Sequence, residues 1–410
     1  MADASRLDAA GHVLLLLARL LLEAGADSEH VRRRVEALAE RLGFAAQLFL
    51  GSERLLLMLG SGEAYRTRIG HAVGAMGIDS GRMVALEAVV AAIARGELDL
   101  PTADARLTAI AASKPSYPDW LTILAVAATA AALARLFSAP WSVVGAAFLA
   151  GLINTLLRRM LPRLGVKPVA AAAITAAISG IAAVLPLRLI QSDPTLALVS
   201  AGMILVPGVP LINGVRDLVR GHAAIGLARL ANGAIIVLAI AAGLAFASLA
   251  MGVHLPIALR TPNLSLQWDI IFAAVAAFGF SILFGAPRQA ILPIALTGAL
   301  AHGARTALMA IGVDIGIATL AGSLLAGLLA QWIGQRLATP WTALVFPGVV
   351  AMVPGSYAFR GMIGALDIMV ESASTPLPLL GATLAAMIAA CVLTVSIGVG
   401  LLAASNFERS

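Results

Sequence analysis

Polar and ionisable side chains gather directly after two Pro-Gly pairs that interrupt otherwise apolar stretches of this sequence. Pro207-Gly208 is followed by an amide, two guanidinium groups and a carboxylate, and Pro354-Gly355 is followed by a hydroxyl, a phenol, a guanidinium group and a carboxylate. Arginine binds carboxylates, and a carboxylate accepts hydrogen bonds from an ammonium group. These residue types predict a binding site for a small molecule that carries one or both of these groups.

The predicted substrate-binding residues are both Pro-Gly pairs and the polar side chains near them: Pro207, Gly208, Asn213, Arg216, Asp217, Arg229, Asn232, Pro354, Gly355, Ser356, Tyr357 and Arg360. Arg229 and Asn232 are included because residues three apart share a helical face. Ionisable groups in or beside membrane segments usually face a cavity or a partner. In the alternative interpretation, Arg216 and Asp217 are interfacial charges that flank a helix end.

Two residues are candidates for carrying a proton. Asp217 is the carboxylate of the first stretch, and His302 has a side chain that titrates near neutral pH. His302 lies three residues before Arg305, and Asn154 lies four residues before Arg158, so each pair forms a polar face in an apolar segment. The alternative for His302 is a packed histidine whose hydrogen bonds are satisfied.

Enzymatic and metal-binding motifs are missing from the sequence. There is no Walker A motif, no Gly-x-Ser-x-Gly motif and no His/Glu metal spacing, so we expect no enzymatic activity, no cofactor and no metal. The one cysteine, Cys391, excludes an intramolecular disulfide. The pI is near 10.4, but the basic residues stand singly between apolar runs, so we do not expect nucleic-acid binding.

Charge is spread unevenly along the 410 residues. Residues 1–114 hold 13 Lys/Arg and 14 Asp/Glu, whereas 15 Lys/Arg and 8 Asp/Glu remain in the other 296 residues. Over the whole chain 60% of the residues are hydrophobic and 12% are charged, against about half and a quarter in an average soluble domain. The sequence therefore predicts a soluble domain over 1–114 that is joined to a polytopic membrane domain.

The segment 1–114 is predicted to be a small α+β domain in the cytoplasm, followed by a linker over 114–120. Its expected elements are a helix over Leu14–Leu22, a second helix capped by Asp27 or Ser28, a hairpin of Phe44–Leu50 and Leu55–Leu59, and helices over Arg82–Arg95 and Thr102–Ser113.

Ten apolar segments follow, each long enough to cross a slab about 30 Å thick. They cover roughly 120–137, 141–160, 168–187, 195–212, 225–251, 268–285, 289–309, 314–335, 341–358 and 378–403. With both termini in the cytoplasm, the inner ends hold ten basic residues: Arg158, Arg159, Arg163, Lys167, Arg216, Arg220, Arg229, Arg288, Arg336 and Arg409. The outer ends hold five, Arg135, Arg188, Arg260, Arg305 and Arg360. This bias favours an inner-membrane protein with both termini cytoplasmic.

The membrane segment contains an internal repeat at an offset of 147 residues. The offset aligns Leu136–Pro140 with Leu283–Pro287, Arg158 with Arg305, and the two Val-Pro-Gly sequences with each other. We therefore predict a five-helix repeat over 115–260 and a second over 261–410. Because five is odd, the second repeat is expected to enter the membrane inverted, as in many secondary transporters.

The fourth and ninth apolar segments contain the Pro-Gly pairs. Proline removes a backbone donor and glycine weakens a helix, so both segments are expected to unwind there. Unwound backbone at membrane depth persists only where protein or a wet cavity satisfies it. Paired breaks at matching positions predict the substrate site, and a kink without ligand contact is the alternative.

Three segments resemble the threonine/serine exporter family. Leu20–Gly43 (LLLEAGADSEHVRRRVEALAERLG) is similar to the start of its N-terminal domain, and Ile204–Gly221 (ILVPGVPLINGVRDLVRG) and Phe346–Met362 (FPGVVAMVPGSYAFRGM) are similar to the signature segments of its two membrane halves. The resemblance covers about 12–404, in a fused single-chain form. It implies a cytoplasmic N-terminal domain, ten transmembrane helices and export driven by the proton motive force. Split two-subunit relatives are implicated in succinate export.

We therefore expect a secondary exporter of small hydrophilic metabolites, threonine and serine first, that uses protons and works in a lipid bilayer. A dicarboxylate such as succinate is the alternative substrate, since the signature stretches hold more arginine than carboxylate. A channel or a receptor with an active cytoplasmic domain is the alternative from another class. Assembly into a homo-oligomer stays open.

Overall fold

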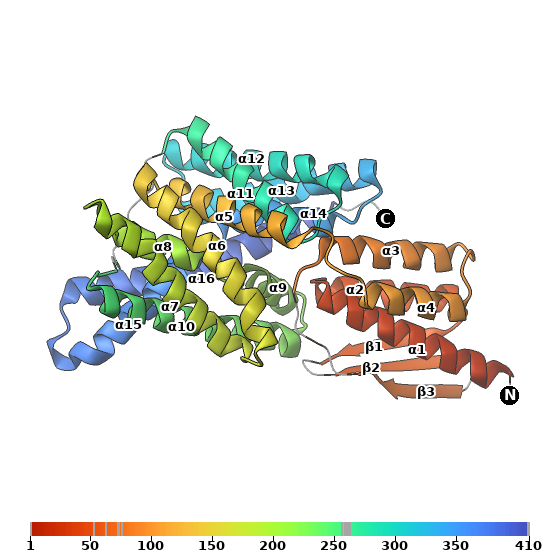
Figure 1. Ribbon diagram of the computed structural model, residues 1–410. Coiled ribbons are helices and arrows are strands. Elements are labelled where there is room, and N and C mark those ends of the chain that lie inside the picture. Colours follow the sequence, from red (N-terminus) through yellow and green to blue (C-terminus); the bar gives the residue numbers. More distant parts are fainter. Residues whose placement is uncertain are drawn as a thin grey trace.

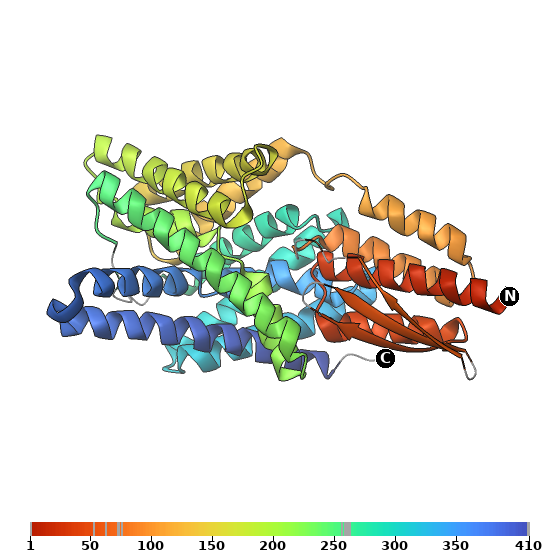
Figure 2. The same cartoon turned by 90° about the horizontal axis from the view of Figure 1, so that it is seen from below.

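The computed structural model describes residues 2–51, 54–61, 64–71, 74, 77–255, 257 and 264–407. Figures 1 and 2 show two parts side by side: the N-terminal elements up to α4 at one end, and a larger bundle of helices at the other. The predicted inner charge Arg409 and outer charge Arg260 lie outside the described residues.

In its described residues, the N-terminal unit combines four helices with a three-stranded antiparallel sheet in the order β1-β2-β3. Its elements are α1 (Ala2–Glu23), α2 (Ser28–Arg41), β1 (Ala45–Leu50), β2 (Leu55–Ser61), β3 (Ala64–Ile69), α3 (Ser80–Ala94) and α4 (Leu100–Ala111). The predicted hairpin is confirmed by the β1–β2 pairing, whereas β3 and the early start of α1 were missed. Buried leucines of α1, among them Leu14 and Leu21, pack against Leu55 and Leu57 of β2 in one apolar core.

Within the described residues, the bundle contains eight continuous helices that are long and apolar enough to cross a membrane. They are α5 (Asp119–Leu136), α6 (Trp141–Arg163), α7 (Pro168–Leu189), α10 (Ala223–Met251), α11 (Leu266–Leu283), α12 (Arg288–Ala310), α13 (Ile315–Leu337) and α16 (Leu377–Ser405). The chain is thus a polytopic membrane protein of mostly helical structure.

Two further segments are bent helix pairs, which raise the number of spans to ten if each pair crosses once. α8 (Thr195–Met203) meets α9 (Gly208–Val219) at 58°. The segment from α14 (Trp341–Val349) through the short 3₁₀ helix Val350–Met352 meets α15 (Gly355–Glu371) at 50°. Pro207 and Pro354 are the residues that precede α9 and α15, so both predicted helix breaks are present.

The helix boundaries repeat at the offset seen in the sequence. α5 and α6 begin and end 147 residues before α11 and α12, and α9 begins 147 residues before α15. Residues with positive φ that end three helices pair at the same offset: Ser138 with Gly285, Gly165 with Gly312, and Gln191 with Ala338. α10 and α16 are related by 154 residues instead, because α15 is longer than α9. Inversion of the second repeat in the membrane stays a prediction.

The two helix breaks contact each other reciprocally. A Cβ atom added to Gly208 would lie 2.9 Å from a Val353 methyl carbon, and one added to Gly355 would lie 2.8 Å from a methyl carbon of Val206. Each valine is therefore packed on the glycine of the other break. Such exchange of equivalent contacts is what a two-fold relation between two surfaces produces.

One glycine, Gly151, allows the close approach of α5 and α6. A methyl group at Gly151 would lie 2.7 Å from Cα of Ala127, whereas no heavy atom lies within 4 Å of one at Gly145 in the same helix. We expect Gly151→Ala to lower the stability by about 1–3 kcal/mol, because α5 and α6 must separate. Gly145→Ala should raise it by up to about 1 kcal/mol through helix propensity. Unfolding midpoints of the two purified variants in one detergent test this, and equal midpoints would contradict the packing.

Candidate functional site

A cavity of about 710 Å³ lies between the two helix breaks. The continuous stretch Met203–Pro210 lines one side, and Val350, Ala351, Val353, Gly355 and Ser356 line the other. Side chains from α5, α6, α7, α10 and α11 complete the wall, with Gly77 and Ile78 of the N-terminal unit. The size is within the range of small-molecule sites in proteins.

The cavity wall is apolar except at a few points. Arg158 of α6 is the charged residue among the described lining, and its side chain is exposed to the cavity. It makes no hydrogen bond or ion pair with any residue that the structure describes. The Ser356 hydroxyl is buried and has no hydrogen-bond partner within the described part of the chain. The first residues of α9 and α15 line the cavity too. The first N–H groups of a helix have no hydrogen-bond partner within that helix.

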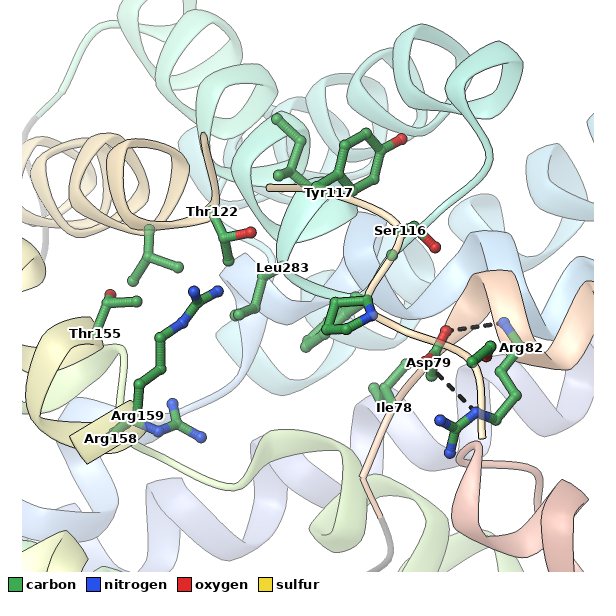
Figure 3. A pocket seen from close by; sticks show the side chains of 16 residues that line it. Ile78, Asp79, Arg82, Ser116, Tyr117, Thr122, Thr155, Arg158, Arg159 and Leu283 are labelled. Atoms are coloured by element: carbon green, nitrogen blue, oxygen red, sulfur yellow. Dashed lines mark hydrogen bonds and ion pairs between the residues drawn. The ribbon is translucent and has the colours of Figure 1, made fainter. Parts of the chain in front are cut away.

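A second cavity of about 330 Å³ adjoins the first, and Arg158, Ile78, Leu283 and Phe284 line both. Figure 3 shows Arg158 and Arg159 on one side of this smaller cavity and Asp79 with Arg82 on the other. Thr122 and Thr155 also face it, together with Ser113 and with residues 115–117 of the linker. The smaller cavity therefore extends from the helix-break cavity toward the N-terminal unit.

Four of the predicted substrate-binding residues instead contact the loop between α1 and α2. Arg216 pairs with Asp27 at 2.8 Å, and the Asn213 amide donates to the Gly25 carbonyl at 2.9 Å. Asp217 accepts from the Ser28 N–H at 3.0 Å.

Arg229 completes this polar cluster, which we call the docking cluster: the loop Gly25–Ser28 with Asn213, Arg216, Asp217, Arg220 and Arg229. Arg229 pairs with Asp217 at 2.9 Å and donates to the Ala26 carbonyl at 3.0 Å. Asp27, Arg216 and Asp217 are each at most 1% exposed, so the ions are balanced by one another and not by water.

Electrostatics explain how Asp27 stays ionised in this cluster. Burial alone would raise the pKa of the Asp27 carboxyl, but the Arg216 and Arg220 guanidinium groups outweigh burial and hold that pKa well below its ordinary value. The same carboxylate caps α2 by accepting from the His30 N–H at 3.1 Å. One side chain therefore both begins α2 and attaches it to α9.

Further contacts hold the N-terminal unit and the linker against both halves of the bundle. The Ser80 hydroxyl donates to the Ala343 carbonyl at 2.7 Å, and the Tyr117 hydroxyl donates to the Ala286 carbonyl at 2.6 Å. Glu29 contacts His222 at 3.1 Å, and although burial alone would raise the pKa of Glu29, hydrogen bonds from Arg32 and His222 lower it.

The remaining predicted residues are dispersed. The large cavity is lined by Pro207, Gly208, Gly355 and Ser356. Pro354 is the residue before Gly355 and is not part of the described lining. Tyr357 and Arg360 are buried in α15 away from its lining. Asn232 is exposed on α10 and does not join Arg229 in the docking cluster.

His302 lies at a separate polar cluster in α12. Its Nδ1 is 2.8 Å from Asp269 of α11, and its Nε2 is 3.5 Å from Arg305. The contact between Asp269 and His302 lies inside the helix bundle, since both side chains are buried. Within the described residues no group of three or more His, Cys, Asp or Glu side chains is placed to hold a metal ion.

Comparison with known proteins places this arrangement in a family. The family model "Putative threonine/serine exporter" matches residues 12–251, and "Threonine/Serine exporter, ThrE" matches 269–407. The chain belongs to the threonine/serine exporter family. In this exporter-family chain both family segments are fused, and both helix breaks fall within them, so the predicted resemblance is confirmed.

Two relatives of this family member carry different substrate names. A "Probable threonine/serine exporter" of Mycobacterium tuberculosis is 26% identical over 73% of this chain, which spans 61% of that relative's length. A "Probable succinate transporter subunit YjjP" of Klebsiella aerogenes is 30% identical over 62% of this chain and 98% of its own length. No solved structure matches the chain.

Sequence reasoning missed two features of this exporter-family site. Asp27 was predicted only as a helix cap, because no spacing in the sequence indicates that a loop contacts a helix 189 residues later. Arg158 was noted for its repeat partner and its basic neighbours, yet left out of the site. Its pairing with Arg305 at the repeat offset was the signal that could have included it.

The docking cluster predicts strong coupling between Asp27 and Arg216. Arg216→Ala leaves a buried carboxylate with one partner fewer, so we expect a loss of about 3–5 kcal/mol, and Asp27→Ala should cost a similar amount. The double variant should lose clearly less than the sum of the two. Arg66→Ala, which removes a half-exposed pair with Asp8, should cost about 0–1 kcal/mol. Thermal unfolding of the four purified variants measures this, and additive losses would contradict the pairing.

The same cluster predicts the pH range of docking. Because the pKa of Asp27 is lower in the folded protein than in the unfolded chain, its stabilisation is complete above about pH 4 and is lost as the pH falls through the folded value. The hydrogen-exchange protection of the Ser28 N–H, which donates to Asp217, measures attachment of the N-terminal loop and should therefore stay equal between pH 6 and 8. Arg216→Ala should lower this protection throughout this range.

Proposed function

We propose that the chain is a secondary exporter of small hydrophilic metabolites, with threonine and serine as its substrates and the proton gradient as its energy source. The observation that carries the proposal is the cavity between two reciprocally packed helix breaks. Family membership and the name of the mycobacterial relative support the substrate class. The N-terminal unit then lies in the cytoplasm and the bundle in the inner membrane, with both termini inside.

The breaks supply what a zwitterionic amino acid needs. N–H groups at the starts of α9 and α15 are suited to a carboxylate, since a helix N-terminus carries partial positive charge. Carbonyl groups at the end of α8, near Met203 and Leu205, carry partial negative charge and suit an ammonium group. The Ser356 hydroxyl is a third polar contact in the same cavity. With Asn213, Arg216, Asp217 and Arg229 held by the N-terminal loop, we narrow the proposed substrate site to this cavity.

Alternating access follows from the repeat in this proposal. Two inverted units related by a two-fold axis between the breaks can rock about the bound substrate and open it to either side. The smaller cavity beside the N-terminal unit is then the cytoplasmic approach to the substrate.

For proton coupling, we favour His302 over Asp217. Asp217 is ionically balanced by Arg229 and hydrogen-bonded by Ser28. His302 contacts a buried carboxylate, Asp269, so protonation of this pair changes the charge of a site inside the bundle. His302→Gln should then reduce uphill export while leaving exchange intact, because exchange needs no net proton movement. Asp217→Asn should instead loosen the docking cluster.

A dicarboxylate such as succinate is the second candidate substrate. Two observations favour it: the described lining of the large cavity has a cation and no carboxylate, and the Klebsiella relative is matched over almost its whole length. Counterflow in proteoliposomes with labelled threonine, serine and succinate decides between the substrates. A channel or receptor would show no counterflow with any of them.

Restoring helix at the breaks tests the proposed site. We expect Pro207-Gly208→Ala-Ala and Pro354-Gly355→Ala-Ala to abolish counterflow while insertion stays normal, because continuous helices would fill the cavity with ordered backbone. Pro186→Ala, which removes a proline inside the unbroken helix α7, is the matched control and should transport normally. Full counterflow in either double variant would show that the breaks are only kinks.

A further inference from the structure

We infer that Arg158 binds the carboxylate of the transported substrate. This inference rests on the proposed function and names the residue that recognises the charged group common to threonine, serine and succinate. It also places the substrate where the two cavities meet, because Arg158 lines both of them.

Arg158 differs from the arginines around it in having no anion of its own. Arg159, its neighbour, forms an ion pair with Asp119. Arg82, across the smaller cavity, is paired with Asp79 at 3.8 Å. Among the residues that the structure describes, no carboxylate pairs with Arg158, although protein surrounds the cavity that its side chain enters. An arginine inside a helical bundle without a counter-ion is costly unless water or a ligand solvates it.

The second repeat shows what surrounds an arginine at the same position. At the offset of 147, Arg305 corresponds to Arg158. There Nε2 of His302 contacts Arg305, and Nδ1 of the same ring contacts the carboxylate of Asp269. In the first repeat the corresponding residues are Thr155 and Thr122. Thus one arginine is connected through a histidine to a protein carboxylate, and the other lies in a cavity whose described lining gives it no carboxylate partner.

The two threonines do not replace the missing anion. The Thr155 hydroxyl donates to the Gly151 carbonyl at 2.8 Å, and the Thr122 hydroxyl donates to the Pro118 carbonyl at 3.3 Å. Both hydroxyls line the smaller cavity, where their oxygens still accept hydrogen bonds. The first repeat therefore keeps the cation and leaves space for a carboxylate that the ligand supplies. A guanidinium group holds a carboxylate through two parallel hydrogen bonds.

The test compares acids with amides in which a carboxamide replaces each carboxylate, on the purified full chain. Threonine and succinate should raise the unfolding temperature of the wild type, and threoninamide and succinamide should not. In Arg158→Gln the half-saturating concentration of the acids should rise about 10- to 100-fold, the value of a charge-assisted hydrogen bond. Arg158→Lys should lie between the two, because its ammonium keeps the charge but not the paired hydrogen bonds.

Arg159→Gln is the matched control, since it removes the neighbouring charge from the same cavity wall and should leave discrimination between acid and amide unchanged. Arg158→Gln should also be at least as heat-stable without ligand as the wild type, because it removes an unpaired charge. A large loss of stability in Arg158→Gln would contradict the absence of a protein partner for Arg158. In that case Arg158→Lys still tests whether the arginine recognises the carboxylate of the ligand.

Counterflow separates this inference from the proposed function. If acids stabilise the wild type but not Arg158→Gln, and counterflow is absent, Arg158 is a carboxylate site and the exporter proposal fails. If counterflow occurs and Arg158→Gln still prefers acids over amides, the exporter proposal stands and the inference about Arg158 is overturned. Lack of both effects in the wild type overturns both.

Discussion

Backbone groups that leave a helix inside an apolar environment must find partners in protein or water, and two Pro-Gly pairs impose this requirement at the centre of the bundle. The solution is reciprocal: Val206 packs on Gly355 and Val353 packs on Gly208. This contact holds the breaks together without filling the space beside them. The cavity lined by both breaks is the consequence, and the other helices form its wall.

A second requirement comes from the arginines of α9 and α10. Arg216 and Arg229 are almost completely buried, so each needs an anion, and Asp27 and Asp217 provide it. Because Asp27 belongs to the loop before α2, satisfying these charges also fixes the N-terminal unit against the bundle. Ile78 of that unit is thereby brought to the wall of both cavities. The N-terminal unit is part of the surroundings of the proposed site.

The two halves share a backbone but differ in chemistry at equivalent positions. The boundaries of α5 and α6 coincide with those of α11 and α12 at one offset, as do three positive-φ turns. Yet Thr122 and Thr155 line a cavity together with Arg158, whereas the equivalent residues Asp269 and His302 contact each other and His302 contacts Arg305. Divergence of this kind suits a division of labour in which one half recognises a charged substrate and the other responds to protons.

Much of the fold could be predicted from the sequence, because its determinants are local along the chain. Apolar runs of sufficient length define the membrane helices, Pro-Gly pairs define the breaks, and Asp27 at the start of α2 defines a cap. The repeat offset likewise needs no structure, since it compares the chain with itself. The cavity-lining residues Pro207, Gly208, Gly355 and Ser356 were found for this reason. Strand β3 was missed because its polar residues show no apolar alternation.

The tertiary structure alone decided which charges have partners. Asn213, Arg216, Asp217 and Arg229 have the same residue types as a ligand site, and their sequence gives no sign that a loop nearly 190 residues earlier contacts them. Arg158 looks in sequence like one more basic residue at a helix end. Whether a protein carboxylate neutralises an arginine depends on distances of a few ångströms between segments that are remote in the chain. The order of residues in the sequence does not contain those distances.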